Sequence, residues 1–479
     1  MNIANVLSES KRERFRPSRK LKICHLVATV EGGRWCFEQL RELRDRYGHD
    51  VTAILSGTEG SLPDLCADAG IRVLTAEFNL VGSHGKGFMR SWPAKVKALS
   101  DLLLQERFDV VQTHVLTTML FGRTAAWLAD VPVRLSMIAG PFHLMAYTTR
   151  WLDAWTAWME TGLIPSCRLS HDLCRAMGVP ERKLALIYYG PDQTRFDPAT
   201  VSPAGLRQKM GWDADTPIVT MVAYFYPRMV NTSWIPVAVK GKGAKGHEEL
   251  IRAAAVVIRQ FPQTKFVLVG KGWGPTGEQF MEEMRALVTE LDLGNSVFFL
   301  GGRDDVPSIY RDTTIAVQVP LNENLGGSIE ALLMERPLVA TRVGGLVDAV
   351  RDGETGILVQ PGNPASLAEG ILKLLRDPEM AARLGKQGRA FTLEKFTLDT
   401  SVDELAAFYE RQSQTVKPGY RSWPRALRYG LGGALFGVLA FRYLLVDNLM
   451  LQRLPSAIRA AKARLARHMR RVQSHLFPG

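Results

Sequence analysis

Two series of short apolar segments, each interrupted by turns and helical stretches, constrain the fold of this 479-residue chain more than any other feature. The first series begins with an apolar run from Ile23 to Ala28 and continues with VTAIL, IRVL, FDVVQTH and VRLSMI. The second begins near Ile218 and comprises IVTMVAY, KFVLVG, SVFFLG, TIAVQV and LVAT. Continuous apolar runs of this length, alternating with helical segments, predict parallel strands that are buried on both faces. We therefore expect an α/β protein with two Rossmann-like domains facing a cleft, and ligands at the carboxyl ends of the strands.

Residues 320–350, PLNENLGGSIEALLMERPLVATRVGGLVDAV, carry the most specific binding signal of the chain. They predict the end of a buried strand, a glycine-containing loop, a helix, a second strand and a further glycine turn. The loop offers the backbone N–H groups of Gly326 and Gly327 at a helix N-terminus, where the helix dipole favours phosphate. Glu330, one turn into that helix, can accept hydrogen bonds from a ribose diol. The segment therefore predicts a site for a nucleotide diphosphate.

This segment resembles the signature of retaining glycosyltransferase family 4, a family of GT-B fold in which two glutamates flank a glycine-rich loop and hold a nucleotide-sugar donor. Glu330, followed by alanine, matches the second glutamate. The family spacing puts Asn322 at the first position, whereas the neighbouring acid Glu323 fits a loop that is one residue shorter. We favour Glu323, and the alternative is Asn322 as a neutral hydrogen-bonding substitute. The resemblance places four further loop residues beside the donor: Asn324, Leu325, Gly326 and Gly327.

Other segments resemble family positions around the reacting groups. Lys245 in GAKGHEELI matches a Lys-Gly pair whose ammonium neutralises the donor phosphates, and a compact positive charge suits a leaving diphosphate. His143 in MIAGPFHLM lies near the place where the family has a histidine, and an imidazole there can hydrogen-bond the donor sugar or steer the acceptor proton. The resemblance thus implies catalytic roles for four residues: Glu323, Glu330, His143 and Lys245.

Three glycine turns complete the donor site that the resemblance implies. Gly32 and Gly33 in EGGRW follow the first strand, and Gly272 follows the strand in VGKGWG. Arg303 in FLGGRDDVPSIY lies where the family reads the base edge, and its alternative role is to cap the helix that starts near Val306.

Three further residues each have a functional and a structural interpretation. Arg34 can hold an anionic acceptor group or form a surface salt bridge. His114, at the end of a strand, can face the cleft or pack in the core. Arg228 is the only arginine in the extended loop before Lys245, where the family has an arginine partner for that lysine, and it can reach the diphosphate or lie at the periphery.

Family landmarks divide the chain into five parts. LALIYYGPDQTRFDP resembles the entry into the interdomain linker, and FTLEKFTLDTSVDELAAFYERQ resembles the helix by which GT-B chains return to their first domain. The expected parts are a basic arm, an acceptor-side Rossmann-like domain, a donor-binding Rossmann-like domain, a crossing helix and a basic amphipathic tail, at residues 1–20, 21–198, 199–396, 397–415 and 416–479.

Positive charge is concentrated at the two ends of the chain. Residues 417–479 contain twelve Lys or Arg and one acid, Asp447, and residues 1–22 contain seven Lys or Arg and two Glu. Because the formal net charge is only +12, the body between these ends is slightly negative, and we expect no nucleic-acid partner. The uncharged run 429–441 is shorter than the about 20 residues that cross a bilayer. The ends therefore predict attachment of a helical C-terminal appendage, residues 417–479, to an anionic membrane surface, with packing on protein as the alternative.

These features predict a glycosyltransferase that moves a sugar from a nucleotide-diphosphate sugar to a glycan or lipid-linked acceptor, with retention and without a metal or other cofactor. The five cysteines show no CxxC spacing and residues 1–22 contain no apolar signal core, so we expect a cytoplasmic protein, peripheral on the inner face of the cell membrane. The alternatives are another GT-B enzyme, such as a sugar-nucleotide epimerase or a phosphorylase, and a non-catalytic scaffold.

Overall fold

The computed structural model describes residues 17–78, 88–229, 234–415 and 430. By its internal contacts the chain divides into a large unit, residues 1–84 and 94–422, and a small unit, residues 85–93 and 423–479. Both sheets lie in the large unit. The predicted basic arm is described only from residue 17, and the predicted tail, apart from Gly430, lies outside the described residues. In the part of the chain that is described, no helix is long and apolar enough to cross a membrane.

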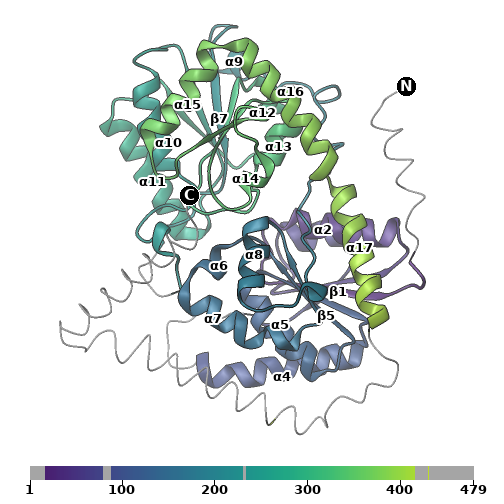
Figure 1. Ribbon diagram of the computed structural model, residues 1–479. Helices are drawn as coiled ribbons and strands as arrows, with labels where there is room; N and C mark the ends of the chain where they lie inside the picture. Colours follow the sequence, from purple (N-terminus) through teal and green to yellow (C-terminus); the bar gives the residue numbers. More distant parts are fainter. Residues whose placement is uncertain (1–16, 79–87, 230–233, 416–429, 431–479) are drawn as a thin grey trace, which may run out of the picture. The chain divides into compact units, whose positions relative to one another are not determined.

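A six-stranded parallel sheet forms the first half of the large unit, with the strand order β3-β2-β1-β4-β5-β6. Its strands are β1 (Lys22–Val27), β2 (Asp50–Leu55), β3 (Arg72–Thr75), β4 (Val110–His114), β5 (Val133–Ile138) and β6 (Gly162–Pro165). The central strands are buried along almost their whole length, because helices cover both faces of the sheet (Figure 1). This double burial explains why their sequences are continuously apolar instead of alternating.

Helices connect these strands. They are α2 (Arg34–Asp45), α3 (Ser61–Asp68), α4 (Phe88–Glu106), α5 (Val115–Leu128), α6 (Phe142–Met145), α7 (Tyr147–Thr156), η1 (Ala157–Met159), α8 (Arg168–Ala176) and η2 (Glu181–Lys183).

The second half repeats the architecture, with the strand order β12-β11-β10-β7-β8-β9. Its strands are β7 (Ile218–Val222), β8 (Lys265–Val269), β9 (Val297–Gly301), β10 (Ile315–Gln318), β11 (Leu338–Thr341) and β12 (Ile357–Val359). Its helices are α9 (Leu206–Met210), η3 (Val237–Val239), α10 (His247–Val257), α11 (Gly274–Glu290), α12 (Val306–Asp312), α13 (Ser328–Leu333), α14 (Leu346–Ala349), α15 (Pro364–Arg376) and α16 (Pro378–Lys395). Asn363 and Asp377 cap α15 and α16 by accepting a backbone N–H, and a proline follows each cap.

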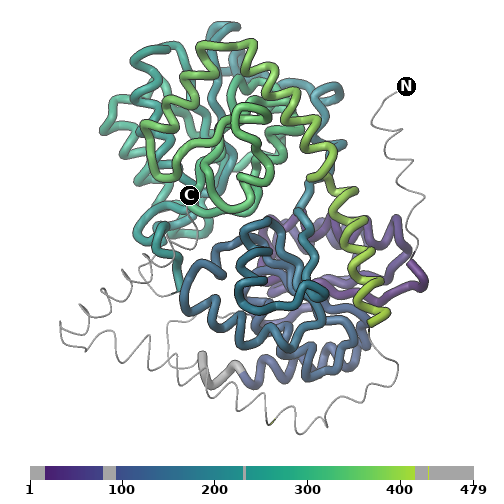
Figure 2. The backbone as a smooth tube through the Cα atoms, viewed as in Figure 1, coloured from purple at the N-terminus to yellow at the C-terminus, as the bar shows by residue number. Residues whose placement is uncertain are grey.

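The last described long helix, α17 (Leu398–Thr415), packs against the first sheet, as the trace in Figure 2 shows. Its residues Val402, Leu405 and Phe408 are buried in the same hydrophobic cluster as Ile23 of β1 and Leu135 of β5. The chain therefore leaves the second half and completes the core of the first. The domain limits expected from the sequence stay predictions.

Both sheets have the doubly wound order, in which the winding direction reverses once: between β1 and β4, and between β7 and β10. Ligands of such folds bind outside the carboxyl ends of the strands at these reversal points. The predicted strands are confirmed to within two residues. Of the strands in the described residues, β6 and β12, two edge strands of four and three residues, were not predicted. The fold therefore directs attention to the loops that follow β7 and β10.

Candidate active site

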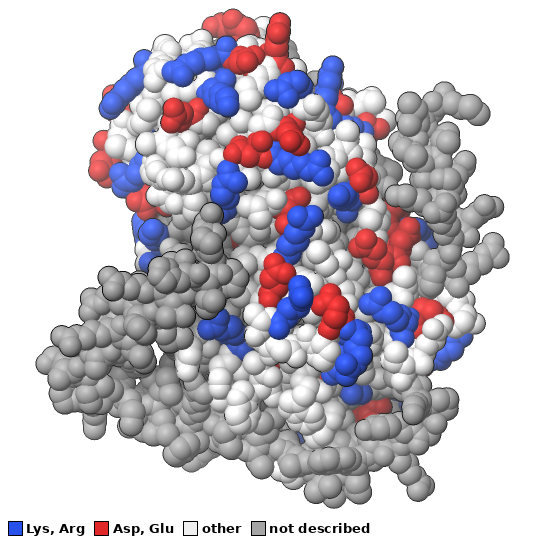
Figure 3. Space-filling model, viewed as in Figure 1, with Lys and Arg blue, Asp and Glu red and all other residues white. Residues whose placement is uncertain are grey.

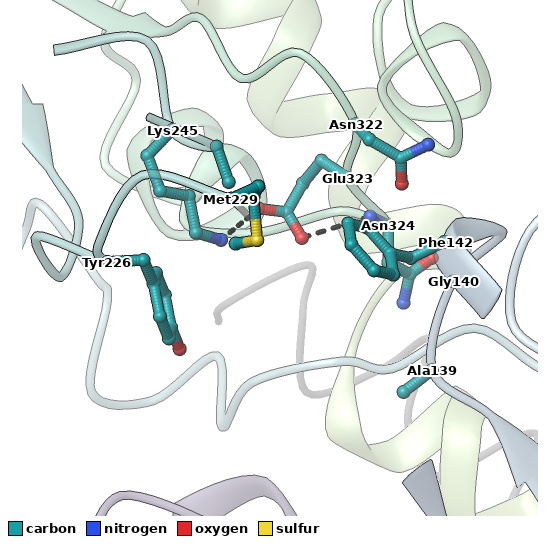
Figure 4. Close-up of a pocket in the computed structure, with 10 residues that line it drawn as sticks. Ala139, Gly140, Phe142, Tyr226, Met229, Lys245, Asn322, Glu323 and Asn324 are labelled. Atoms are coloured by element: carbon teal, nitrogen blue, oxygen red, sulfur yellow. Dashed lines mark hydrogen bonds and ion pairs between the residues drawn. The ribbon is translucent and has the colours of Figure 1, made fainter. Parts of the chain in front are cut away.

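A pocket of about 170 Å³ lies where loops from both halves of the large unit meet (Figure 4). Its lining residues come from the loops after β5, β7 and β10 and from the turn before α10: Ala139, Gly140, Phe142, Tyr226, Met229, Ala244, Lys245, Asn322, Glu323 and Asn324. The volume is below the roughly 300 Å³ at which pockets for drug-sized ligands begin. It is therefore suited to one part of a larger ligand.

Lys245 and Glu323 form an ion pair at the wall of this pocket. In Figure 4 the ammonium of Lys245 points at the Glu323 carboxylate, and it lies 5.6 Å from the centre of the Tyr226 ring. Burial lowers the pKa of the Lys245 ammonium, but the Glu323 carboxylate raises it by more, so the pKa lies above its ordinary value. The pocket therefore holds a fixed positive charge at neutral pH.

Asn324 supports Glu323 and offers an unused acceptor. Its backbone N–H donates a hydrogen bond to Oε1 of Glu323 at 3.0 Å. Its side-chain Oδ1 is buried and has no hydrogen-bond partner among the described residues. Buried polar atoms are nearly always paired, so an unpaired acceptor in a pocket wall indicates a donor group on the ligand.

Gly140 brings the first half of the unit against this loop. Its φ is +126°, and a Cβ at this position would lie 3.1 Å from the Cβ and 3.3 Å from the backbone nitrogen of Asn324. Glycine is required both for this backbone conformation and for the close approach. A side chain here would push apart two loops that together form the pocket.

Asn322 lines the same pocket but is turned toward α6. Its Nδ2 donates to the sulfur of Met145 at 3.0 Å, whereas the Lys245 ammonium donates to Glu323. Of the two candidates for the first acidic position, Glu323 is therefore the residue that lies beside Lys245.

The loop then enters α13. Leu325 is only 2% exposed and packs in the hydrophobic core, so its side chain cannot reach a ligand. Gly326 has a φ of +53°, and Gly327 is the N-cap of α13, a helix of six residues. The contribution of these three residues to a ligand is therefore limited to their backbone.

Glu330, one turn into α13, belongs to a second charged group that does not line the pocket. Burial raises the pKa of its carboxyl to about 7, which the Arg195 guanidinium partly offsets and the Glu38 carboxylate reinforces. Glu38, on α2, has its own pKa raised to about 7, chiefly by burial, and its carboxylate lies 3.8 Å from Arg195. Carboxyls that titrate near neutrality beside an arginine are typical of functional sites.

The turn between β1 and α2 lies near this group. Gly32 and Gly33 both have left-handed backbones, with φ of +68° and +69°. A Cβ on Gly32 would lie 3.9 Å from the Tyr224 hydroxyl, so the turn faces the aromatic residues that follow β7. Burial and the nearby Arg195 lower the pKa of Arg34, which begins α2 and does not line the pocket.

Arg228 is engaged away from the pocket. Its guanidinium forms ion pairs with Glu248 at 3.1 Å and Glu283 at 2.8 Å, and it lies over the Phe280 ring. These contacts favour its structural interpretation over a contact with a diphosphate.

Arg303 and Gly272 also have partners outside the pocket. Arg303 forms two hydrogen bonds with Asp305, at 2.7 and 2.8 Å, at the start of α12. The N–H of Gly272 donates to Oε1 of Glu278 at 2.9 Å, and a Cβ here would collide with the backbone of Glu278. Gly272 is therefore required for the packing of its own loop against α11.

His143 is buried on α6 and is not among the residues that line the pocket. Its Nε2 lies 3.9 Å from Oδ2 of Asp153, and burial lowers the pKa of its imidazole. Asp153 in turn forms a fully buried ion pair with Arg123 at 2.8 Å. The geometry assigns His143 to this internal ionic cluster.

His114 belongs to a buried polar network at the centre of the first sheet. Its Nδ1 lies 3.3 Å from the Tyr189 hydroxyl, and its Nε2 lies 3.2 Å from Nδ1 of His25. The Nε2 of His25 faces the Tyr409 hydroxyl at 2.9 Å, and that hydroxyl donates to Gln112 at 2.7 Å. Burial lowers the pKa of both imidazoles. The network thus joins α17 to β1 and β4 through neutral side chains.

Cys36 joins the same network, which the spacing of the cysteines in the sequence did not reveal. Its sulfur lies 3.7 Å from Nδ1 of His25, and the potential ligand atoms of His25, Cys36 and His114 all lie within 4.8 Å of one another. All five cysteines are buried and none forms a disulfide. Because each imidazole also faces a tyrosine hydroxyl, hydrogen bonding alone accounts for how both rings are held.

Some residues at the site were not predicted from the sequence. Phe142 and Met229 line the pocket, while their polar neighbours His143 and Arg228, which sequence reasoning selected, do not. Arg195, in the linker, reaches the charged group of Glu330. The sequence analysis chose polar residues as candidates, whereas the backbone conformation determines which of two adjacent side chains faces the pocket.

Charged side chains of both signs are interspersed over the visible face of the molecule (Figure 3). Among the described residues on that face, no continuous positive surface of the kind that nucleic-acid-binding proteins present is visible.

Comparison with known proteins identifies the family. The model for glycosyl transferases group 1 matches residues 239–391, and that for the glycosyl transferase 4-like domain matches residues 31–190. The chain is 28% identical to a putative glycosyltransferase, EpsD, of Bacillus subtilis (strain 168), over 66% of this chain and 80% of that protein.

A second relative and a solved structure agree with this match. The chain is 24% identical to the UDP-Gal:alpha-D-GlcNAc-diphosphoundecaprenol alpha-1,3-galactosyltransferase of Escherichia coli, over 65% of this chain and 78% of that enzyme. The fold is similar to that of HepE from Anabaena, solved with UDP and glucose, with a TM-score of 0.66 and 21% identity over 81% of this chain and 98% of that chain. The protein belongs to the group 1 glycosyltransferases of GT-B fold.

Proposed function

We propose that this glycosyltransferase moves a sugar from a nucleotide-diphosphate sugar to a lipid-linked glycan, with retention of the anomeric configuration. The observation that carries the proposal is the Lys245–Glu323 ion pair in the wall of the pocket. On donor binding, a diphosphate would take the place of the Glu323 carboxylate beside the ammonium. The released carboxylate would then accept hydrogen bonds from hydroxyls of the donor sugar.

The same geometry would assist bond cleavage. As the glycosidic bond breaks, the leaving diphosphate gains negative charge, and a preorganised cation stabilises that charge without reorganisation. Lys245 is such a cation, since its pKa is raised and its position is held by Glu323. We assign the neutralising role to Lys245 and no role to a metal, so EDTA should leave activity unchanged. The unpaired Oδ1 of Asn324 would accept a hydrogen bond from a sugar hydroxyl.

Retention is supported by the charges that line the pocket. A single inverting displacement needs a general base on the acceptor side of the sugar. Among the described residues that line the pocket, Glu323 is the one carboxylate, and it lies beside the lysine that we assign to the leaving group. The described lining therefore offers no base opposite the leaving group. This favours a mechanism in which the leaving diphosphate departs and the acceptor attacks on the same face of the donor sugar.

A lipid-linked acceptor is supported by one relative and by the composition of the tail. The relative from Escherichia coli is named for transfer to a sugar on diphosphoundecaprenol. Residues 417–479 are strongly basic, which suits attachment to an anionic membrane, and they lie outside the described residues apart from Gly430. We accordingly propose that the protein works peripherally on the inner face of the cell membrane.

The test begins with the full-length protein and a panel of UDP-, GDP- and ADP-sugars. A donor present at 100 times its Kd should stabilise the fold by about 2.7 kcal/mol in a thermal-shift assay. With that donor, a diphosphoprenol-linked saccharide should yield a new lipid-linked product by mass spectrometry, and NMR should show the donor's anomeric configuration in it. A product of opposite configuration would refute retention. Conversion of the donor to another nucleotide sugar without acceptor would instead identify an epimerase.

A second prediction separates Glu323 from Asn322. Glu323→Gln should lower kcat by at least about tenfold, because it removes a charged hydrogen-bonding partner worth about 1.5–3 kcal/mol. Asn322→Ala is the matched control in the same loop, and we expect its kcat to fall by less than about threefold, because its amide donates to Met145 while Lys245 donates to Glu323. Steady-state kinetics on both folded variants measures the difference. The reverse order would transfer the role of the first acid to Asn322.

A further inference from the structure

The helix α7 and the short η1 that follows it present aromatic side chains to solvent. Tyr147, Trp155 and Trp158 are 58%, 43% and 54% exposed. Together with Trp151 they follow one another at intervals of four, four and three residues, which places them on one helical face. The Trp151 and Trp155 rings lie 5.0 Å apart. These four residues are called the aromatic face below.

The opposite side of α7 is buried and, apart from Leu152, polar. Thr149, Asp153 and Thr156 face the interior, where the guanidinium of Arg123 binds Asp153 and Thr156, each at 2.8 Å. Arg123 is fully buried and also lies 3.2 Å from Glu160. The usual amphipathic pattern of a surface helix is thus reversed. Because the ionic cluster holds α7 in this orientation, the exposure of the aromatic residues follows from the fold.

We infer that the aromatic face docks on the surface of an anionic phospholipid bilayer. Tryptophan and tyrosine, with an apolar ring and a polar group, are the residues that concentrate at membrane–water interfaces. The only charged residues between positions 145 and 158 are Asp153, which is buried, and Arg150. Arg150 has no ion-pair partner in the described parts of the chain, so its charge is available to lipid phosphate.

The size of the aromatic face favours a bilayer over a second protein. The ten residues of α7 span about 15 Å, at 1.5 Å per residue. A specific protein interface buries about 800 Å² on each partner, which a strip on one short helix cannot supply. An interfacial membrane contact needs only a few inserted aromatic side chains and a nearby cation.

The aromatic face adjoins the pocket through α6. Phe142, the first residue of α6, lines the pocket, and Met145, its last residue, accepts a hydrogen bond from Asn322. Only Ala146 separates α6 from α7. Docking of α7 would therefore hold one wall of the pocket near the bilayer, where a lipid-linked acceptor is presented. This role in acceptor delivery rests on the proposed function, whereas docking itself does not.

The test uses the full-length protein and vesicles of phosphatidylcholine with phosphatidylglycerol, at high salt to weaken binding by basic segments. Trp155→Ser combined with Trp158→Ser should lower the vesicle partition constant by at least about tenfold, because both rings lose their apolar contact. Leu104→Ser combined with Val256→Ser is the matched control, since both residues are exposed on other helices, and it should change the constant by less than about twofold. Lipids brominated in the acyl chain should quench wild-type tryptophan fluorescence more than that of the Trp155/Trp158 variant.

Charge is tested separately. At low salt, Arg150→Gln should weaken binding to the anionic vesicles by about fivefold and leave binding to pure phosphatidylcholine unchanged. If the double tryptophan variant does not fold, the inference is tested by the vesicle partition constant of Tyr147→Ser and by the quenching of wild-type tryptophan fluorescence.

Equal vesicle partition of the tryptophan variant and its control would overturn the inference. The inference would also be overturned if the tryptophan variant lost concentration-dependent self-association but kept its vesicle binding, because the aromatic face would then contact a second copy of the protein. Docking without transfer to any lipid-linked acceptor would reject the proposed function and leave docking intact. Transfer to such an acceptor without docking through α7 would reject the inference alone.

Discussion

Lys245→Ala should lower kcat/KM for the nucleotide-sugar donor by about 10²- to 10³-fold, the largest loss that we expect from one substitution. The variant removes the preorganised charge that would stabilise the leaving diphosphate, and loss of one such group typically costs about 2.7–4 kcal/mol. The unpaired Glu323 carboxylate that remains would also repel the donor phosphates. Steady-state kinetics with the donor found in the thermal-shift panel measures the effect.

Lys242→Ala is the matched control for this prediction. Lys242 lies three residues before Lys245 in the same glycine-rich turn but does not line the pocket. We expect it to retain activity to within about threefold, and both variants should show wild-type circular dichroism. Equal losses in the two variants would mean that Lys245 acts only through general surface charge, and full activity of Lys245→Ala would remove it from the site.

Glu330→Gln should weaken donor binding by about 10- to 100-fold at pH 8 and by much less at pH 6. Burial raises the pKa of Glu330 to about 7, so the free protein carries the carboxylate at pH 8 and mostly the neutral acid at pH 6. The carboxylate is the form that accepts charged hydrogen bonds from a ribose diol, worth about 1.5–3 kcal/mol. Wild-type affinity should therefore rise with pH through about 7 and level off above it, while the variant stays flat.

Calorimetry with an intact nucleotide sugar measures this profile, because its diphosphate does not titrate in this range. Glu369→Gln, an exposed acid on α15, is the control and should follow the wild type. Glu38→Gln should move the midpoint of the profile to lower pH without abolishing it, because the Glu38 carboxylate raises the pKa of Glu330. A wild-type affinity that is constant from pH 6 to 8 would contradict the assignment of the titrating group.

The parallel sheets were predictable from the sequence because their strands are buried on both faces. β5 and β11 begin and end with the predicted segments VRLSMI and LVAT, and the other predicted strands differ by two residues at most. β6 and β12 were not predicted: β6 has only Leu163 and Ile164 between a glycine and a proline, and β12 has only three residues.

The residues of the candidate site were also predicted only in part. Lys245, Glu323 and Asn324 were predicted to lie near the donor. The pocket brings them together because β7 and β10 are parallel neighbours in the sheet, so the segments that follow them meet at its carboxyl edge. His143 and Arg228 were selected for their chemistry alone. Each is adjacent to a pocket-lining residue but is held elsewhere, His143 beside Asp153 and Arg228 by Glu248 and Glu283.

The doubly wound fold and the charged loop at its reversal point could be predicted, since both depend on patterns within a few residues. Which polar groups share a site depends instead on contacts between segments that are far apart in the chain. The Arg195–Glu38 pair acts on Glu330 from a linker and a helix more than 130 residues away in sequence, and no local pattern encodes that proximity. The reversed polarity of α7 has the same origin, because Asp153 can be buried only where Arg123 of α5 meets its charge.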